Sequence, residues 1–287
     1  MQFPTGCLAH LPEHGTWKTT SVGRDLANAT WCIDNGAQTY FVKRYGHDEM
    51  FGRAPGETVR LDRELATLSL APQVVWSSVA DGICVFEWMN AATIADEFDP
   101  HRRAQLLGQT LATIHQAEPS GPRWSLRARV QHYCDALTKL HPRRGREAQS
   151  DCDSYADLFR RWDEEPHVFC HHDLNAEHVF LGNEPRVIDW EYAGYGHPGF
   201  DLASTIVVND LYDDEISELL ASYQEHSGRS IDRESVRDWL RLVALVNRIW
   251  FHLQEAIAEH EALKQAEEGE DAQAHARTSR ETLSVSR

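Results

Sequence analysis

The stretch HHDLNAEHVFLGNEPRVIDWEYAGYGHPGFDLAS, residues 171–204, decides the fold that we expect for the whole chain. A polar run holding Asp173 is followed by two short apolar segments, HVF and RVID, on either side of the turn LGNEP. Apolar segments around a turn rich in glycine, asparagine and proline predict a β-hairpin. Because Asp173 precedes this hairpin and Asp189 ends its second strand, we expect both carboxylates at one cleft.

Two carboxylates at one cleft suit phosphoryl transfer, which needs a group to accept the hydroxyl proton and ligands for a divalent cation. The histidines of the same stretch also allow a zinc site made of His171, His172, Asp173 and His178. The zinc reading is weaker, because the spacing is not an HExxH pair and adjacent histidines on extended chain point to opposite sides.

The sequence on either side of this stretch is mostly helical in pattern. Apolar residues recur three and four apart in RRAQLLGQTLATIHQ (102–116), LRARVQHYCDALTKL (126–140) and RDWLRLVALVNRIWFHLQEAIAEHEAL (237–263). Residues 264–287 are polar and contain no aromatic residue, so we expect a flexible tail there.

The first part of the chain alternates between strand and helix patterns. TWCID and AQTYFVKRYG flank the turn Asn35-Gly36, which predicts a hairpin. A helical segment follows at 57–72 and ends at Pro72, and two apolar strand candidates lie at 73–78 and 82–89. The expected order is strand, strand, helix, strand, strand.

The quoted stretch resembles the catalytic segment of the choline, ethanolamine and thiamine kinases, in the aminoglycoside-phosphotransferase branch of the protein-kinase-like superfamily. The family pattern is HxDxxxxN followed by a strand ending in ID(W/F)EYAG, and the chain has HHDLNAEH and IDWEYAG. The resemblance spans roughly Val22 to Leu263. It implies an α+β, protein-kinase-like, two-lobed fold, with a small β-rich nucleotide-binding lobe at 1–90 and a larger, mainly α-helical catalytic lobe at 91–263.

The resemblance also implies cofactors and roles for the catalytic segment. ATP and Mg²⁺ would be the cofactors, Asp173 would accept or orient the hydroxyl proton, His171 would orient the loop, and Asp189 would hold the metal. His178 stands where the family has a magnesium-binding asparagine. Three alternatives follow: His178 binds the metal with Mn²⁺ tolerated or preferred, Asn175 supplies an oxygen instead, or catalysis is weak or lost.

Three further elements match the nucleotide side of the family. Lys43, in YFVKRY, corresponds to the phosphate-binding lysine, and we expect Glu57 on the following helix to pair with it, with Glu64 as the alternative. The loop SVGRDLANAT resembles the phosphate-covering turn and keeps Gly23 and Asn28.

The segment VFEWMN resembles the family's hinge, where the backbone groups of Glu87 and Met89 would meet the adenine. After the catalytic strand, we expect Asp201 in GFDLAS to have a structural role, capping and bracing the catalytic loop.

Aromatic residues provide the substrate prediction. In choline kinases, tryptophans on a late helix hold a quaternary ammonium by cation–π attraction. Trp250 in LVNRIWFHLQ fits one such position, whereas Asn247 occupies the other. We assign further substrate contacts to Trp190, Glu191 and Tyr192. Trp190, Tyr192 and the nearby Tyr195 are equally compatible with core packing.

Composition limits the partners. A net charge of −17 disfavours nucleic acid and anionic lipid and suits a cationic small molecule, although an acidic surface also serves solubility. The six cysteines form no CxxC pair, no signal peptide is evident and no apolar run would span a membrane. We therefore expect a soluble cytoplasmic protein, monomeric or homodimeric.

These observations predict an ATP-dependent kinase that phosphorylates the hydroxyl of a small, cationic alcohol such as choline or ethanolamine. The alternatives are a thiamine or aminoglycoside-type kinase and a nucleotide-binding, pseudokinase-like module.

Overall fold

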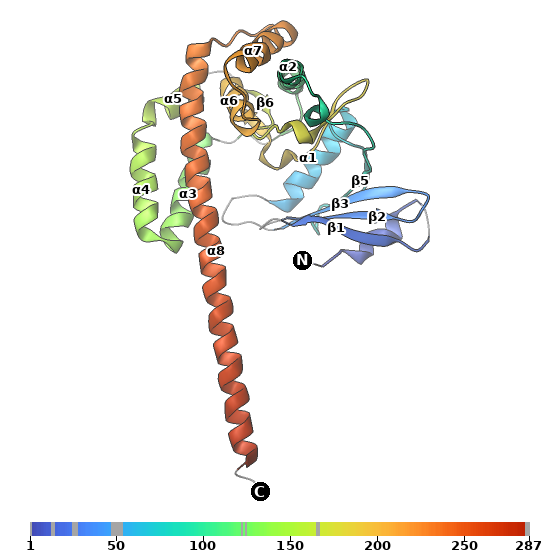
Figure 1. Ribbon diagram of the computed structural model, residues 1–287, viewed down its shortest axis with the longest axis vertical. Coiled ribbons are helices and arrows are strands. Elements are labelled where there is room, and N and C mark those ends of the chain that lie inside the picture. Colours follow the sequence, from blue (N-terminus) through green and yellow to red (C-terminus); the bar gives the residue numbers. More distant parts are fainter. Residues whose placement is uncertain are drawn as a thin grey trace. The chain divides into compact units, whose positions relative to one another are not determined.

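An antiparallel sheet with strand order β1-β2-β3-β5-β4 forms the N-terminal part of the computed structural model (Figure 1). The structure describes residues 2–12, 15–24, 28–46, 54–121, 123, 125–164 and 167–284. The strands are β1 (Lys18–Arg24), β2 (Asn28–Asp34), β3 (Thr39–Tyr45), β4 (Val74–Ser78) and β5 (Ile83–Glu87). Residues 25–27 of the expected phosphate-covering turn lie outside the described residues.

Alternation along β3 gives the sheet two different faces. Tyr40 and Val42 pack on one side with a buried cluster that includes Cys7 of the short helix η1 (Thr5–His10). Phe41 and Tyr45 pack on the other side, against Val59 of helix α1 (Pro55–Thr67). Because successive side chains of a strand point to opposite faces, Lys43 shares the α1 face with Phe41 and Tyr45.

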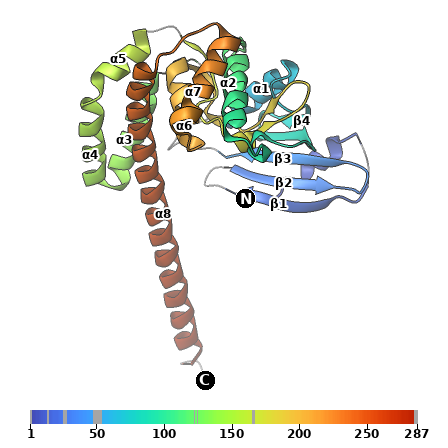
Figure 2. The same cartoon turned by 45° about the horizontal axis from the view of Figure 1, so that its top comes forward.

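The remainder of the chain is mainly helical (Figure 2). Its helices are α2 (Pro100–Gln116), α3 (Leu126–Leu140), α4 (Pro142–Asp153), α5 (Ala156–Glu164), α6 (Pro198–Val208), α7 (Asp213–Ser227) and α8 (Arg233–Ser284). The short elements between them are η2 (Ile94–Asp96), β6 (Val168–Cys170), η3 (Ala176–His178), β7 (Val179–Phe180), β8 (Arg186–Val187), η4 (Trp190–Tyr192) and β9 (Gly194–Gly196). The expected protein-kinase-like architecture, with a β-rich N-terminal part and a mainly helical C-terminal part, is confirmed.

Helices α2 and α7 pack closely and support the catalytic segment. A β-carbon at Gly108 would lie only 2.4 Å from the Leu219 carbonyl oxygen, so glycine permits this approach. The buried core between these helices extends to Phe169 of β6 and Trp190 of η4. The short strands that carry the site residues therefore rest on a packed helical base.

The chain divides into two compact units, Met1–Arg129 with Asp157–Val243, and Val130–Ala156 with Ala244–Arg287. The first unit contains the whole sheet and the catalytic segment. Within the second, Arg248 of α8 pairs with Asp151 of α4 at 2.7 Å. The lobe boundary near residue 90 stays a prediction.

Helix α8 continues through Ser284, and the flexibility that we expected from residue 264 onward stays a prediction. The segment is polar, but it is rich in alanine, glutamate and glutamine, which favour helix. Polarity alone does not exclude a helix. Within the described residues, no helix is long and apolar enough to cross a membrane.

Candidate active site

A buried carboxylate on α6 holds the loop that carries Asp173 through hydrogen bonds to its backbone. Asp201 is fully buried, and it accepts hydrogen bonds from the backbone N–H groups of His171 (2.9 Å) and His172 (2.7 Å). Its Oδ2 atom also lies 3.0 Å from His115 Nε2. Burial alone would raise the pKa of Asp201, but the His115 hydrogen bond and the nearby histidines hold it well below its usual range. This geometry matches the bracing role expected for Asp201.

The buried His171 ring connects the loop that carries Asp173 with the strand end that carries Asp189. Its Nε2 atom lies 3.1 Å from the Ile188 carbonyl oxygen, to which it donates, and its Nδ1 atom accepts from the Asp173 N–H at 3.3 Å. Burial lowers the pKa of His171 to about 4, so the ring is neutral at pH 7. The two ring nitrogens of His171 thus hold the Asp173 loop against the segment that ends at Asp189.

Asp173 has the electrostatic character of a general base. Burial, followed by the negative charges of Asp189, Glu191 and Asp201, raises the pKa of Asp173 to about 7. A carboxylate with a pKa near neutral pH accepts a proton far better than an ordinary exposed aspartate.

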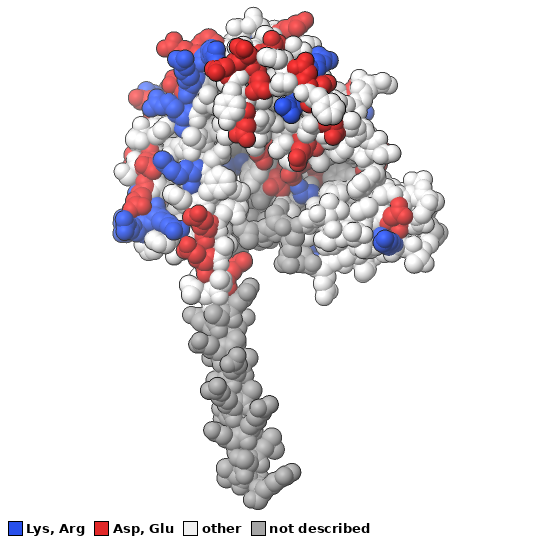
Figure 3. Space-filling model, viewed as in Figure 1, with Lys and Arg blue, Asp and Glu red and all other residues white. Residues whose placement is uncertain are grey.

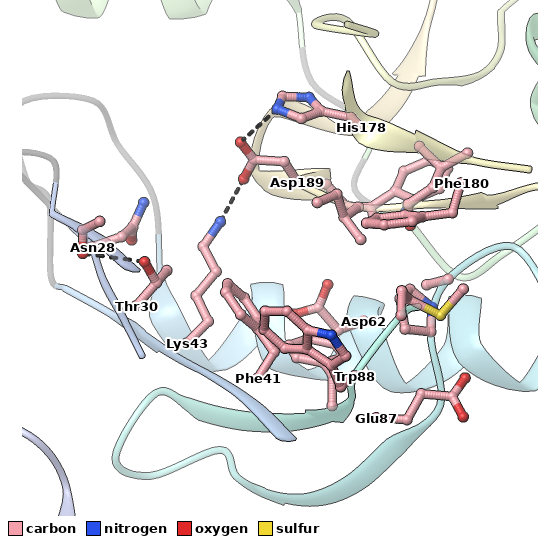
Figure 4. A pocket seen from close by; sticks show the side chains of 18 of the residues that line it. Asn28, Thr30, Phe41, Lys43, Asp62, Glu87, Trp88, His178, Phe180 and Asp189 are labelled. Atoms are coloured by element: carbon pink, nitrogen blue, oxygen red, sulfur yellow. Dashed lines mark hydrogen bonds and ion pairs between the residues drawn. The ribbon is translucent and has the colours of Figure 1, made fainter. Parts of the chain in front are cut away.

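Asp189 and Lys43 meet at the edge of a cavity (Figure 4). The Lys43 ammonium forms ion pairs with Asp189 and, at 3.4 Å, with Glu191. Burial would raise the pKa of Asp189, but the charges of Lys43 and His178 outweigh it and lower the pKa to about 2. Asp189 also adopts the left-handed conformation, with φ of 69°. Such backbone strain in a non-glycine residue clusters at functional sites.

Glu191, which we predict to contact the substrate, binds two other side chains in this structure. Its Oε2 atom accepts from Asn28 Nδ2 at 2.6 Å and from Lys43 Nζ at 3.4 Å. Asn28 begins β2 and is buried. Glu191 therefore connects the predicted phosphate-covering strands to the segment that carries Asp189.

The predicted pairing of Lys43 with Glu57 or Glu64 is wrong. Glu57 is exposed, and Glu64 Oε1 accepts instead from the Ser120 N–H at 2.7 Å. The α1 carboxylate on the side of Lys43 is Asp62, which is 2% exposed and accepts from the Tyr45 hydroxyl at 2.6 Å.

Helix phase explains this correction. Asp62 lies about 140° around the helix from Glu57, and Glu64 lies within about 20° of Glu57. Asp62 falls among the buried residues Val59, Leu65 and Ala66, so it belongs to the face that packs on the sheet. Its negative charge contributes to the raised pKa of Lys43.

His178 and Asn175, the alternative metal ligands, lie in different environments. The His178 Nε2 atom is 3.8 Å from Asp189 Oδ2, and His178 lines the cavity. Asn175 caps η3 instead, with its Oδ1 atom accepting from the Glu177 N–H at 2.9 Å.

The zinc alternative has no support in the described part of the chain. There, one group of three or more potential ligands is close enough to share a cation, and it consists of His115, Cys170 and Asp201. All three are buried, and His115 and Asp201 are already hydrogen-bonded to each other. The histidines of the catalytic loop form no such group.

The cavity has a volume of ≈ 500 Å³, which suits part of a nucleotide. Figure 4 shows Phe41 and Trp88 on one side and Phe180 on the other. The remaining lining residues include Gly23, Asn28, Phe86, Glu87, Met89, Val187 and Ile188. Aromatic and aliphatic side chains thus line a slot for a flat ring, and charged groups gather beside Lys43.

The expected nucleotide-binding residues are brought together here, Glu57 excepted. Gly23 and Asn28 lie at the cavity with Lys43, and Glu87 and Met89 line the same cavity. The Glu87 N–H donates to the Gln73 carbonyl oxygen at 3.0 Å, so that N–H is already used.

The predicted substrate aromatics do not form an open wall. Trp190 is 2% exposed, and its Nε1 atom donates to the Val187 carbonyl oxygen at 2.8 Å, so it is a core residue. The Tyr192 ring faces the Arg129 guanidinium at 5.8 Å, and the Tyr195 ring faces Arg123 at 5.2 Å. Trp250 belongs to the second unit, where its ring packs edge-on against Phe251, and its substrate role stays a prediction.

Acidic side chains gather over α2 and α7 on the face seen in Figure 3. This distribution agrees with the net charge of −17. An acidic surface of this kind raises the local concentration of cations.

Comparison with known proteins places this site in a family. The model of the phosphotransferase enzyme family matches residues 18–239. A choline kinase from Streptococcus pneumoniae is 20% identical with a TM-score of 0.61, covering 79% of this chain and 81% of its own. A choline/ethanolamine kinase family protein from Mesorhizobium loti is 19% identical with a TM-score of 0.63, covering 91% and 85%.

The fold is also similar to antibiotic kinases. An aminoglycoside-3'-phosphotransferase of type VIII is 18% identical with a TM-score of 0.61, covering 81% of this chain and 94% of its own. At these identities the likeness shows a common fold. No protein with a curated description matches the chain.

Proposed function

Because the chain belongs to the phosphotransferase enzyme family, we propose that it transfers the γ-phosphoryl group of ATP to the hydroxyl of a small, cationic alcohol such as choline or ethanolamine. One observation carries the proposal. The Lys43 ammonium and the Asp189 carboxylate meet at the charged edge of an aromatic-lined cavity, and burial, followed by the negative charges of Asp189 and Glu191, raises the pKa of Asp173. Phosphoryl transfer requires this combination of a cation, a metal-binding carboxylate and a base.

Lys43 would position the phosphates. Without nucleotide its ammonium is shared by Asp189 and Glu191. Phosphate oxygens would compete with these carboxylates for the ammonium, since both are anionic acceptors. Glu191, which also holds Asn28, would keep the phosphate-covering strands close to the site.

Asp173 would accept the proton of the attacking hydroxyl. Its raised pKa of about 7 makes the proton transfer favourable near neutral pH. His171 and Asp201 would keep the Asp173 backbone in place, because Asp201 accepts from the two N–H groups that precede it and His171 accepts from the Asp173 N–H.

The residues present fit a divalent cation. Asp189 offers an oxygen ligand at the cavity and His178 offers Nε2 beside it. Mg²⁺ is commonly held by one or two carboxylates together with substrate phosphates and water, so few protein ligands suffice. A bound cation supplies charge neutralisation of the phosphates.

The acceptor class follows from charge. The carboxylates around Asp173 and the acidic surface favour a cation. The Tyr192 and Tyr195 rings already face arginines, however, and this favours an ammonium bound by carboxylates over a quaternary ammonium in an aromatic cage. Ethanolamine is therefore our first candidate, choline our second, and an aminoglycoside-type acceptor the main alternative.

Six free cysteines and the use of ATP support a cytoplasmic location. A pseudokinase-like module is the alternative outside catalysis. The presence of Lys43, Asp173 and Asp189 in the arrangement described above favours an active enzyme over that alternative.

The test is ADP release from ATP with Mg²⁺ or Mn²⁺ across ethanolamine, choline, thiamine, aminoglycosides and amino sugars. We expect acceptor-dependent ADP release with at least one cationic alcohol and its loss in Asp189→Asn. Metal-dependent nucleotide binding with no release on any acceptor would contradict the proposal and favour the binding module.

A further inference from the structure

The histidines of the catalytic loop differ in whether the ring reaches the cavity, where one of its nitrogens could bind a cation. His171 is fully buried, and its ring nitrogens contact the Ile188 carbonyl oxygen and the Asp173 N–H. His172 is buried and its Nδ1 atom contacts the Tyr192 carbonyl oxygen. His178 instead lines the cavity, with its side chain 24% exposed.

The His178 ring directs Nε2 at the carboxylate on the cavity edge. Nε2 lies 3.8 Å from Asp189 Oδ2, and Figure 4 shows His178 on the opposite side of that carboxylate from Lys43. Two ligand atoms that each lie about 2.1 Å from one cation are at most about 4.2 Å apart. The present separation is therefore compatible with one shared cation.

The surroundings of the other ring nitrogen of His178, Nδ1, do not fix which nitrogen carries the ring proton. His178 Nδ1 is buried and has no hydrogen-bond partner among the residues that the structure describes. No contact there fixes the ring proton on Nε2, so the proton can reside on Nδ1 while the Nε2 lone pair is donated.

His178 stands where the family has a metal-binding asparagine, and in this geometry Asn175 does not provide the oxygen ligand that such an asparagine would supply. Its Oδ1 atom accepts from the Glu177 N–H at the start of η3, and Asn175 is not among the residues that line the cavity. The cavity edge therefore offers one carboxylate and one imidazole where an all-oxygen pair would suit Mg²⁺ best.

We propose that His178 Nε2 and Asp189 Oδ2 bind the cation of the nucleotide complex together, and that this pair favours Mn²⁺ over Mg²⁺. Imidazole is a better ligand for divalent transition metals than for Mg²⁺, which prefers oxygen, while carboxylate and phosphate oxygens suit Mn²⁺ as well. The inference rests on the proposed function for the presence of a metal–nucleotide complex at this site.

The experiment measures Mn²⁺ binding to the full chain with the non-hydrolysable analogue AMP-PNP, using electron paramagnetic resonance. Pulsed spectra report whether a nitrogen nucleus is coupled to the bound Mn²⁺, and competition with Mg²⁺ gives the relative affinity. His178→Asn is the test variant and His101→Asn, an exposed position on α2, is the matched control. His178→Gln replaces the test variant if thermal unfolding shows that the asparagine variant does not fold.

We expect imidazole nitrogen coupling in the wild type and in the control, and its loss in His178→Asn. The affinity ratio of Mn²⁺ to Mg²⁺ should fall on the order of tenfold in that variant. A wild-type spectrum without nitrogen coupling, or a ratio that the variant leaves unchanged, would overturn the inference.

These outcomes are separable from those of the proposed function. Turnover of an alcohol without nitrogen coupling leaves the kinase assignment intact and removes the role of His178. Nitrogen coupling without turnover on any acceptor supports the metal site and counts against the kinase assignment alone.

Discussion

The environment of Asp201 and the environment of Lys43 are both rich in buried charge, but they are built differently. Asp201 engages two backbone N–H groups and one imidazole, so both of its oxygens have donors. At Lys43 a single ammonium is shared by Asp189 and Glu191, and Asp62 adds a third negative charge. In the first region each carboxylate oxygen has a hydrogen-bond donor, whereas in the second region three carboxylates surround a single lysine.

This difference assigns the two regions different tasks. A fully hydrogen-bonded buried charge fixes its surroundings, since every alternative arrangement leaves donors without partners. An excess of carboxylates around one lysine suits a site in which a bound cation balances the remaining negative charge. We therefore expect substitutions near Lys43 and Asp173 to alter activity and substitutions at Asp201 to alter stability.

The largest expected effect is on turnover in Asp173→Asn. Loss of the proton acceptor should lower kcat by about 10²–10⁴-fold, because general base catalysis contributes this much. Nucleotide affinity should stay within about twofold, since Asp173 is not among the residues that line the nucleotide cavity. Kinetics and calorimetric titration with AMP-PNP measure the two quantities, and loss of both would show that Asp173 is structural.

Asp201→Ala should mainly destabilise the fold. It leaves the His171 and His172 N–H groups and the His115 ring without their acceptor, which should lower the free energy of unfolding by about 3–5 kcal/mol. Urea unfolding measures the change. Asp214→Ala, at an exposed position in the first turn of α7, is the control and should cost less than about 1 kcal/mol. Equal costs in both variants would contradict the scaffold role.

A smaller effect separates Asp62 from Glu57. Asp62→Asn removes negative charge that opposes the binding of anionic phosphates beside Lys43 and should lower the KM for ATP about fivefold, equivalent to about 1 kcal/mol. Glu57→Gln, on the exposed side of the same helix, should change it by less than about twofold. A larger effect of Glu57→Gln would restore the pairing expected from the sequence.

The smallest effect concerns pH and stability. Burial is the first cause that raises the pKa of both Asp62 and Asp173 to about 7. Between an ordinary aspartate pKa of about 4 and this value, the folded protein keeps protons that the unfolded chain releases. These two aspartates therefore lower stability as pH rises from about 4 to about 7. Burial lowers the pKa of His171 and His172 to about 4, so these two histidines raise stability with pH over the same interval, and the net change should be small.

Asp173→Asn tests this pH dependence within the site. Over the same interval the stability of the variant should fall less, or rise more, with pH than that of the wild type, because only Asp62 of the pair still titrates. Thermal unfolding across this pH range measures both slopes. Identical slopes in the two proteins would contradict the raised pKa of Asp173.

The catalytic segment could be predicted from sequence because its chemistry is local. Asp173, His178 and Asp189 lie within one short stretch, so their spacing limits where the side chains go. The Lys43 partner could not be found in the same way, since it depends on how α1 packs on the sheet. One signal was available: Asp62 recurs with Val59, Leu65 and Ala66 at helical spacing, which places a carboxylate on an apolar face.

The substrate residues show the limit of motif reading. Trp190 and Glu191 stand in a segment that matches the family, yet one is packed in the core and the other binds Asn28. Glu191 contacts Asn28 of β2, far away in sequence, and Trp190 stacks on Phe169 of β6. A family motif therefore shows which residue occupies a position, but it does not show which other residues that side chain contacts.

The most direct test of the central claim is ³¹P nuclear magnetic resonance of ATP, a divalent cation, ethanolamine and the protein. If Lys43, Asp173 and Asp189 form a phosphoryl-transfer site, the γ-phosphorus signal should be replaced by that of a phosphomonoester, with ADP formed in equal amount. A spectrum that stays unchanged for ethanolamine, choline and aminoglycoside acceptors, or that yields only inorganic phosphate, would contradict the account.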